Sequence, residues 1–154
     1  MIVVSDTSSI SALLKVGQCE LLRQLYGEVM IPEAVRSELA RAFSTLPQYV
    51  RCAHVENQAE VHRLLQELDL GEAEAIVPAR QIHADALLMD ETKGRRIALR
   101  EGLPLIGLVG VILFAKREGL VPSVRKLIER LESEASFRLA AELKQSAFQT
   151  AGEL

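Results

Sequence analysis

The stretch Ile2-Val3-Val4-Ser5-Asp6 opens the chain with a short β-branched run that ends in an acid. Its apolar residues do not alternate with polar ones, which is typical of a strand buried on both faces of a sheet. The stretch Asp85-Ala86-Leu87-Leu88-Met89-Asp90 repeats this pattern later in the chain. Each predicted strand therefore delivers a carboxylate, Asp6 or Asp90, at its carboxyl end, where open α/β sheets bind their ligands.

Predicted helices separate these strands from others. Val29-Met30-Ile31 and Leu103-Pro104-Leu105-Ile106 are further apolar runs, and Tyr49 to Val55 alternates like an edge strand. Helical spacing of apolar residues marks segments 10–15, 19–26, 33–42, 61–68, 92–100 and 109–117, and a helix beginning at Gly71 that we expect to kink or break near Pro78. This alternation predicts an α/β fold, a three-layer α/β/α sandwich with a central, mainly parallel sheet. Segment 123–147 is amphipathic and predicts a C-terminal helical appendage with Phe137 and Phe148 as docking residues.

Composition limits the kinds of partner that the chain can bind. The 154 residues, 49% of them hydrophobic, fit a globular protein with one core. Only 4% are aromatic and none is Trp, which argues against a base-stacking platform for single strands. The net charge of −3 argues against a surface that binds nucleic acid by bulk attraction. Any contact with nucleic acid must therefore be local or mediated by a metal.

Cysteine and histidine show no metal-binding pattern. Cys19 and Cys52 are too few for a disulfide framework, so we expect two reduced thiols and a cytoplasmic protein. The three histidines lack the short spacings of zinc ligands. No segment has about 20 uninterrupted apolar residues, and we expect neither targeting to a membrane nor crossing of one.

A third acid is expected on the helix that Pro32 opens. Glu38 falls four residues after Ala34 and four before Ala42, which places its carboxylate on the inward side of that helix. A buried, unpaired charge costs several kcal/mol, so Glu38 needs an arginine or a cation as its partner.

The stretch Leu70-Gly71-Glu72-Ala73-Glu74-Ala75-Ile76-Val77 supplies two more carboxylates where a helix is predicted to begin. Glu72 and Glu74 are about 200° apart around a helix, but in its first turn both can lean toward one cation. A simpler interpretation is that Asp69, Glu72 and Glu74 only complement the positive end of the helix dipole. The sequence leaves open which of the two glutamates would bind a cation.

These acids predict a site for a hard cation. Asp6, Glu38, Glu72 or Glu74, and Asp90 could converge at one rim of the sheet, where their mutual repulsion would raise pKa values unless a divalent cation neutralised them. With oxygen ligands and neither His nor Cys, that cation should be Mg²⁺ or Mn²⁺. Such a site acidifies water and clamps phosphate oxygens, which is the chemistry of phosphodiester hydrolysis. The basic residues after Asp90, beginning with Lys93, either hold phosphates or form a solvated helix face.

Motifs in the same order resemble the PIN domain family, in particular its DUF3368 branch, whose members are similar to VapC-type toxins. They cover nearly the whole chain: Asp6-Thr7-Ser8, Pro32-Glu33-Ala34-Val35-Arg36-Ser37-Glu38-Leu39, Leu70-Gly71-Glu72-Ala73-Glu74-Ala75-Ile76, Leu87-Leu88-Met89-Asp90-Glu91, Ile106-Gly107-Leu108-Val109-Gly110-Val111 and the ending from Phe137 to Glu153.

The resemblance implies a Mg²⁺-dependent endoribonuclease, the toxin of a type II toxin–antitoxin pair, with RNA as substrate, a small antitoxin as partner, and a homodimer. Residues 1–122 would form the nuclease domain, and residues 123–154 would pack on it or on a partner. The family's acids fall on Asp6, Glu38, the Glu72/Glu74 pair and Asp90. Thr7 or Ser8 would be the small hydroxyl residue beside the first acid.

Two alternatives remain from the sequence alone. A phospho-receiver module is also an α/β domain with a Mg²⁺-binding acidic pocket, and Lys93 close to Asp90 fits one. Its adjacent acids are missing, however, because Thr7 follows Asp6. The second alternative is a non-catalytic binding module that keeps the fold, although all the acids are retained.

Overall fold

Five short strands form one parallel sheet in the order β3-β2-β1-β4-β5 in a computed structural model that describes all 154 residues. None of the helices combines the length and the apolar character needed to cross a membrane. The strands are β1 (Ile2–Ser5), β2 (Glu28–Pro32), β3 (Val50–Ala53), β4 (Ala86–Leu88) and β5 (Leu105–Ile106). The helices are α1 (Thr7–Lys15), α2 (Glu20–Tyr26), α3 (Glu33–Ala40), α4 (Gln58–Leu64), α5 (Leu70–Gln81), α6 (Thr92–Arg100), α7 (Leu108–Arg117), α8 (Val124–Ala135) and α9 (Ala141–Thr150).

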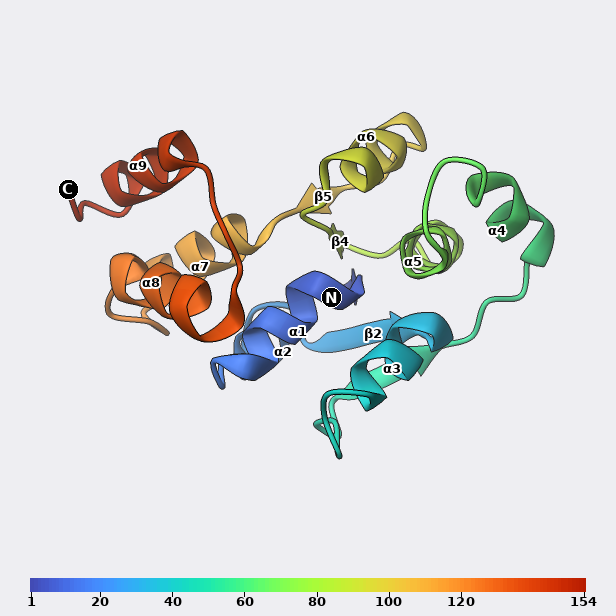
Figure 1. Cartoon of the computed structure of the whole chain (residues 1–154), viewed down its shortest axis with the longest axis horizontal. Helices are drawn as coiled ribbons and strands as arrows, with labels where there is room; N and C mark the ends of the chain where they lie inside the picture. The colour runs from blue at the N-terminus through green and yellow to red at the C-terminus, as the bar shows by residue number, and fades with distance from the viewer.

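Helices cover both faces of the sheet, as predicted. Val3 and Val4 are fully buried on opposite faces of β1, and each belongs to a different apolar cluster. The cluster of Val3 contains residues of α1, α2, α3, α7, α8 and α9, whereas that of Val4 contains residues of α4, α5 and α6. In Figure 1 the helices α7, α8 and α9 lie to the left of the strands, and α4 and α5 lie to the right. The three-layer sandwich is thereby confirmed.

The order in which the chain adds strands to the sheet reverses between β1 and β4. From β1 the chain moves outward through β2 to β3, and β4 and β5 lie on the other side of β1. Ser5 and Leu88 are partners in the register, and Asp6 N donates to Leu88 O at 3.1 Å. Ligands of open α/β sheets bind at such a switch point, outside the carboxyl ends of the strands. The topology therefore places the carboxyl end of β1 at the favoured position for a site.

The predicted break near Pro78 is wrong, because helix α5 passes this residue and continues to Gln81. Pro78 removes one backbone donor from α5, but the residue is buried, so burial of the ring offsets the lost hydrogen bond. At the helix starts, Asp6 is the N-cap of α1 and Glu91 is the N-cap of α6.

The predicted C-terminal appendage consists of two helices, both packed into the apolar cluster that contains Val3, which we call the first apolar cluster. Leu131 of α8 is fully buried, and Phe148 of α9 is buried as well. Between the helices, Ser136 adopts a left-handed conformation with φ of 52°. Glu153 fixes the end of the chain to the first turn of α8 by accepting from Val124 N at 2.7 Å. Burial opposes ionisation of Glu153, but hydrogen bonds, the one from Lys116 foremost, lower its pKa to about 2.

Candidate functional site

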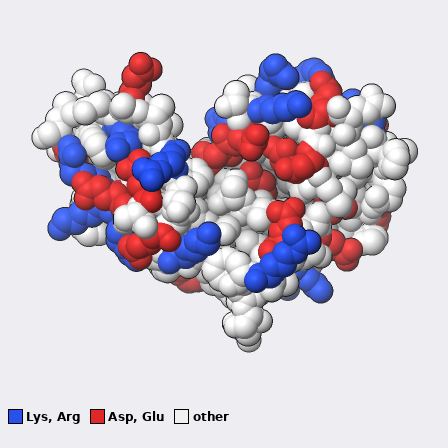
Figure 2. All heavy atoms as spheres, in the orientation of Figure 1, with Lys and Arg blue, Asp and Glu red and all other residues white.

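A cavity of about 330 Å³ opens beside the carboxyl end of β1. Its walls come from α1, α3, the beginning of α5, the loop after β4 and the turn after α8. Figure 2 shows acidic side chains gathered on the hollowed face of the molecule in this view. Five carboxylates line the cavity: Asp6, Glu38, Asp69, Glu72 and Glu91.

The structure brings most of the predicted site residues together. Asp6, Thr7, Ser8, Glu38 and Glu72 all line the cavity. Thr7 Oγ1 is buried there without a hydrogen-bond partner. The other predicted residues, which are Asp90, Glu74 and Lys93, lie outside the lining.

Asp6 and Asp90 are joined through one hydroxyl residue. Asp6 Oδ1 accepts from Ser9 N at 3.2 Å, and Ser9 Oγ donates to Asp90 Oδ2 at 2.8 Å. Leu108 N, at the start of α7, also donates to Asp90, at 3.2 Å to Oδ1 and 3.1 Å to Oδ2. The two strand-end acids therefore lie on either side of Ser9, and Asp90 is oriented by the positive end of a helix. The hydroxyl residue that contacts both acids is Ser9, whereas the resemblance places Thr7 or Ser8 beside the first acid.

Glu72 forms a capping box that leaves one of its oxygens unused. Asp69, the N-cap of α5, accepts from Glu72 N at 2.8 Å, and Asp69 N donates to Glu72 Oε1 at 3.3 Å. The helix begins at Leu70, one residue before the predicted start. Glu72 is only 9% exposed, and its Oε2 is buried with no partner. Such an atom carries a desolvation cost that only a proton or a cation would relieve.

Glu74 points to a different place. Its Oε1 accepts from Ala34 N, in the first turn of α3, at 3.0 Å. The side chain lines a separate cavity of about 50 Å³ with Glu33 and His54. Glu74 therefore complements the dipole of α3, and not that of its own helix as the simpler interpretation had it.

Glu38 lines the cavity but is not buried, which corrects the prediction for its helix. Val35 and Leu39 are the residues of α3 that enter the core, and Ala42 lies beyond the end of the helix. Glu38 precedes Leu39 by one residue, so it is turned by about 100° from the buried stripe. Its Oε1 would be 3.2 Å from a Cβ added at Gly71, so the carboxylate lies against the first turn of α5.

Glycines make room for two other carboxylates. A Cβ added at Gly94 in α6 would lie 2.7 Å from Glu72 Oε2 and 2.5 Å from Met89 Sδ. At Gly107 it would lie 2.7 Å from Asp90 Oδ1. Any side chain at these two positions would displace the acid, so the glycines fix where the carboxylates can stand.

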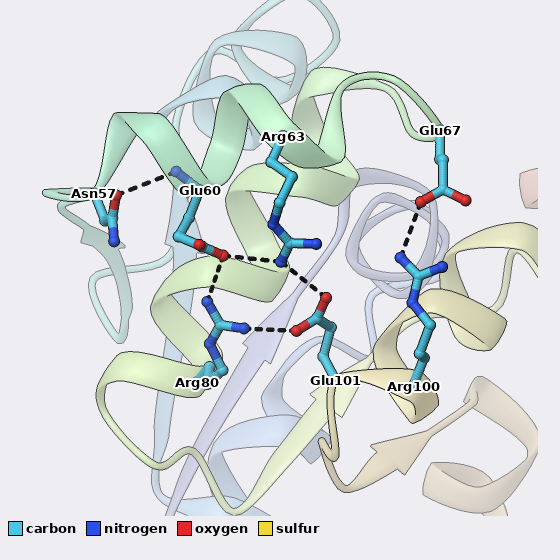
Figure 3. A network of polar contacts seen from close by, with 7 residues as sticks. All are labelled: Asn57, Glu60, Arg63, Glu67, Arg80, Arg100 and Glu101. Atoms are coloured by element: carbon cyan, nitrogen blue, oxygen red, sulfur yellow. Dashed lines mark hydrogen bonds and ion pairs between the residues drawn. The ribbon is translucent and has the colours of Figure 1, made fainter.

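The acids of the cavity have no cationic partners. Elsewhere acids are paired: Glu60 and Glu101 each contact both Arg63 and Arg80, and Glu67 contacts Arg100 (Figure 3). None of the ion pairs in the chain includes a carboxylate of the cavity or Asp90. The switch point of the sheet therefore gathers several acids that no arginine or lysine neutralises.

Burial without counter-charges shifts the protonation of these groups. Burial, with the charges of Asp90 and Asp69 adding to it, raises the pKa of Asp6 to about 6 against the hydrogen bonds from Ser9. Burial together with Asp69 and Glu91 raises the pKa of Glu72 to about 7. The pKa of Asp90 is also raised by burial, although Ser9, Leu108 and Arg95 oppose the shift.

The donor set fits a hard divalent cation. Every candidate ligand is a carboxylate oxygen, and the orphaned Glu72 Oε2 lies in the same cavity as Asp6 and Glu38. No three Asp, Glu, His or Cys side chains lie close enough together in this structure to hold a metal ion. Without a cation their mutual repulsion favours such an open arrangement, and Asp90 turns both oxygens to Ser9 and Leu108.

Sequence reasoning missed several lining residues. The sequence indicates Asp69 and Glu91 only as helix-end or neighbouring acids, and it gives Lys15 and Phe137 no role in the site. It also gives none to Ser9, which does not line the cavity but contacts Asp6 and Asp90. Ser9 could have been found by its spacing, because a residue three positions after an Asp N-cap donates its backbone N–H to that cap. Phe137 could not, since no local pattern indicates that the turn after α8 reaches α1.

Comparison with known families agrees with this site. A family model described as a PIN domain, DUF3368, matches residues 2–153. Comparison with curated proteins gives no match. PIN domains are generally nucleases that use a divalent metal, so the family indicates a hydrolase of phosphodiester bonds. With a matching sheet, a cavity of unpaired acids at its switch point and a match over nearly its entire length, the chain belongs to the PIN domain family.

Proposed function

We propose that the protein is a Mg²⁺-dependent endoribonuclease whose metal is held by Asp6, Asp90, Glu72 and Glu38. The observation that carries this proposal is the group of buried or cavity-lining carboxylates around one cavity, none of which has an ion-pair partner. Mn²⁺ would be accepted by the same all-oxygen donors. A bound Mg²⁺ supplies positive charge to the phosphate and acidifies water.

The chain's own residues orient the reaction. Ser9 holds Asp6 through its backbone N–H and Asp90 through its hydroxyl, so both carboxylates face the switch point in fixed rotamers. Glu72 Oε1 is held by Asp69 N, which leaves Oε2 as the oxygen that would hold the cation. The attacking water gives up its proton to solvent. Water oxygen bonds to phosphorus, the bond from phosphorus to the leaving ribose oxygen breaks, and that oxygen takes a proton from solvent.

The basic experiment is cleavage of single-stranded RNA with Mg²⁺, with Mn²⁺ and with EDTA. We expect cleavage with either metal and none with EDTA. A phospho-receiver would instead become stably acylphosphorylated when incubated with a small phosphodonor and Mg²⁺. Acylphosphorylation without RNA cleavage would overturn the nuclease proposal, and cleavage that persists in EDTA would overturn its metal dependence.

The Gln variants of Glu72 and Glu74 should differ clearly in their rates of cleavage. Glu72→Gln removes the buried charge in the cavity, and we expect cleavage to fall at least about tenfold. Glu74→Gln keeps an oxygen for Ala34 N, so we expect cleavage within about twofold of the parent and a slightly lower thermal stability. Initial rates at saturating Mg²⁺ and melting temperatures of both variants test this. The opposite pattern of rates would assign the metal to Glu74.

Gly94→Ala should disturb the metal site without removing a charged group. The added methyl would meet Glu72 Oε2 at 2.7 Å, and we expect the apparent affinity for Mg²⁺ to fall about tenfold. Gly110→Ala in α7 is the matched control, because its methyl would meet only side-chain atoms of Ile106. Titration of cleavage with Mg²⁺ measures both. Equal Mg²⁺ dependence of Gly94→Ala and the parent would remove Glu72 from the metal site.

The toxin role belongs to the same proposal and is supported by the resemblance to VapC-type proteins. In that role a small antitoxin protein would inhibit cleavage, and the active form would be a homodimer. Expression in a host without an antitoxin should arrest growth, and expression of Asp90→Asn should not. Growth arrest by both forms, or by neither, would contradict the role.

A further inference from the structure

Besides its carboxylates, the cavity has a second wall formed by α1 and the turn after α8. Ser8, Ser11 and Lys15 lie at spacings of three and four on one face of α1, and Ser136 and Phe137 complete this wall. We call these five residues the α1–α8 wall. It joins hydroxyls, one cation and one aromatic ring to a cavity whose other side chains are mainly acidic.

Phe137 is held in place by the backbone around it. The left-handed conformation of Ser136 ends α8, and Phe137 N donates to Leu131 O at 3.0 Å. The ring is half-buried, packs against the first apolar cluster, and is the only aromatic ring that lines this cavity. Its exposed part is therefore presented to the cavity by a rigid turn.

Lys15 is available to an anion. It is exposed at the end of α1 and makes no ion pair with any of the five carboxylates of the same cavity. An ammonium group without a carboxylate partner can bind a phosphate without first breaking a contact. The hydroxyls of Ser8 and Ser11 lie on the same side of the helix and can donate to the same phosphate.

We propose that the α1–α8 wall is a nucleotide subsite for the RNA substrate, an inference that rests on the proposed ribonuclease function. Phe137 stacks on the base next to the cleaved bond, and Lys15 with Ser8 and Ser11 binds the flanking phosphate. Stacking on a side chain requires an unpaired base, so the substrate at this point is single-stranded.

The size and charge of the chain agree with a small subsite. The cavity volume of about 330 Å³ lies at the lower end of the range for ligand pockets, roughly 300–1,000 Å³. With a net charge of −3, the protein cannot rely on general attraction to RNA. A single ring and a single lysine beside the acids supply the local contacts that such a chain needs.

The test for Phe137 compares variants at two positions of the same turn. Phe137→Leu keeps apolar volume but removes the ring, and we expect KM for a short single-stranded RNA to rise about tenfold with kcat little changed. Phe137→Trp should restore the parent KM. Leu139→Ala is the control, because Leu139 packs against the same cluster but does not line the cavity. Parent-like KM in Phe137→Leu, or an equal rise in Leu139→Ala, would overturn the subsite.

An abasic substrate gives an independent reading. If the ring acts by stacking, removing the base next to the cleaved bond raises KM for the parent, and Phe137→Leu then adds nothing. A full tenfold effect of Phe137→Leu on the abasic RNA would show that the ring only supports the fold, and would overturn the proposal.

Lys15 is tested by the salt dependence of binding. With Ca²⁺ in place of Mg²⁺, fluorescence anisotropy of the labelled RNA should show that Lys15→Gln lowers the slope of log affinity against log salt concentration by about 1. Lys126→Gln, another exposed lysine without an ion pair but outside the cavity, should leave the slope unchanged. Equal slopes for both variants would remove Lys15 from the subsite.

The anisotropy measurement also separates the two proposals, because it does not require cleavage. A parent that cleaves RNA with unchanged KM and affinity in the Phe137 and Lys15 variants would leave the nuclease standing and overturn the subsite. A parent that binds RNA through Phe137 and Lys15 but never cleaves it would support the subsite and overturn the nuclease.

Discussion

We expect Asp6→Asn to abolish cleavage and, at the same time, to stabilise the metal-free protein at pH 8. The loss of activity should be at least about 100-fold, because the variant removes a charged oxygen ligand that faces the metal. The gain in stability follows from burial: ionising Asp6 in the folded state is disfavoured, and its pKa rises from 3.8 to about 6. A shift of this size corresponds to about 3 kcal/mol in favour of the neutral side chain.

The fold of the Asp6→Asn variant should stay the same, since the amide oxygen of the new side chain can still accept from Ser9 N. Asp90→Asn should lose cleavage to a similar extent. Glu101→Gln is the control with the opposite pattern, because it breaks the ion pairs with Arg63 and Arg80 but lines a different cavity from the acidic one. It should melt at a lower temperature and cleave normally. An Asp6→Asn variant that cleaves at the parent rate, or that melts well below it at pH 8, would refute the assignment of Asp6.

We expect the stability of the metal-free protein to fall as pH rises from about 4 to 7, and Mg²⁺ to restore it at the alkaline end. Asp6 and Glu72 have pKa values in the folded protein of about 6 and about 7, above their ordinary values of 3.8 and 4.5. Below pH 4 both groups are protonated in the folded and unfolded states, so their contribution is fully present. As pH rises the unfolded chain releases its protons first, and the contribution is lost by the time the folded groups ionise.

Melting temperatures in EDTA and in Mg²⁺, measured at pH 5.5 and pH 8, test this linkage. We expect the EDTA sample to melt lower at pH 8, and Mg²⁺ to raise the melting temperature at pH 8 much more than at pH 5.5. Glu153 does not interfere, because its lowered pKa of about 2 affects stability only under more acidic conditions. Asp6→Asn should flatten the curve. A metal-free protein that gains stability between these two pH values would contradict the pKa shifts.

The parts of the site that follow strands could be predicted, and the parts that depend on tertiary contacts could not. Asp6 and Asp90 could be predicted because a buried apolar run followed by an acid indicates a strand of a parallel sheet with the acid at its ligand-binding end. The choice between Glu72 and Glu74 could not be made, because it depends on a capping box at the start of α5 and on the position of α3 beside the same end of that helix.

The other features that the sequence did not predict also depend on tertiary contacts. Glu38 lines the site from an exposed position, because the apolar stripe of α3 is narrower than its alanines indicated. The need for glycine at Gly94 and Gly107 is visible only when the side chains of Glu72 and Asp90 are placed against them. The predicted break at Pro78 was wrong because burial at that position outweighs the general tendency of proline to end a helix.

The distance along the chain between the two halves of the acidic centre has a consequence for synthesis. Ser9 and its hydrogen-bond partner Asp90 are 81 positions apart, and they meet only after β4 has paired with β1. A nascent chain still emerging from the ribosome before β4 is available carries Asp6, Glu38 and Glu72 but lacks the strand that completes the arrangement. Under the proposed function, cleavage of RNA should therefore begin only after β4 has emerged and paired with β1, and products that terminate before β4 should be inactive.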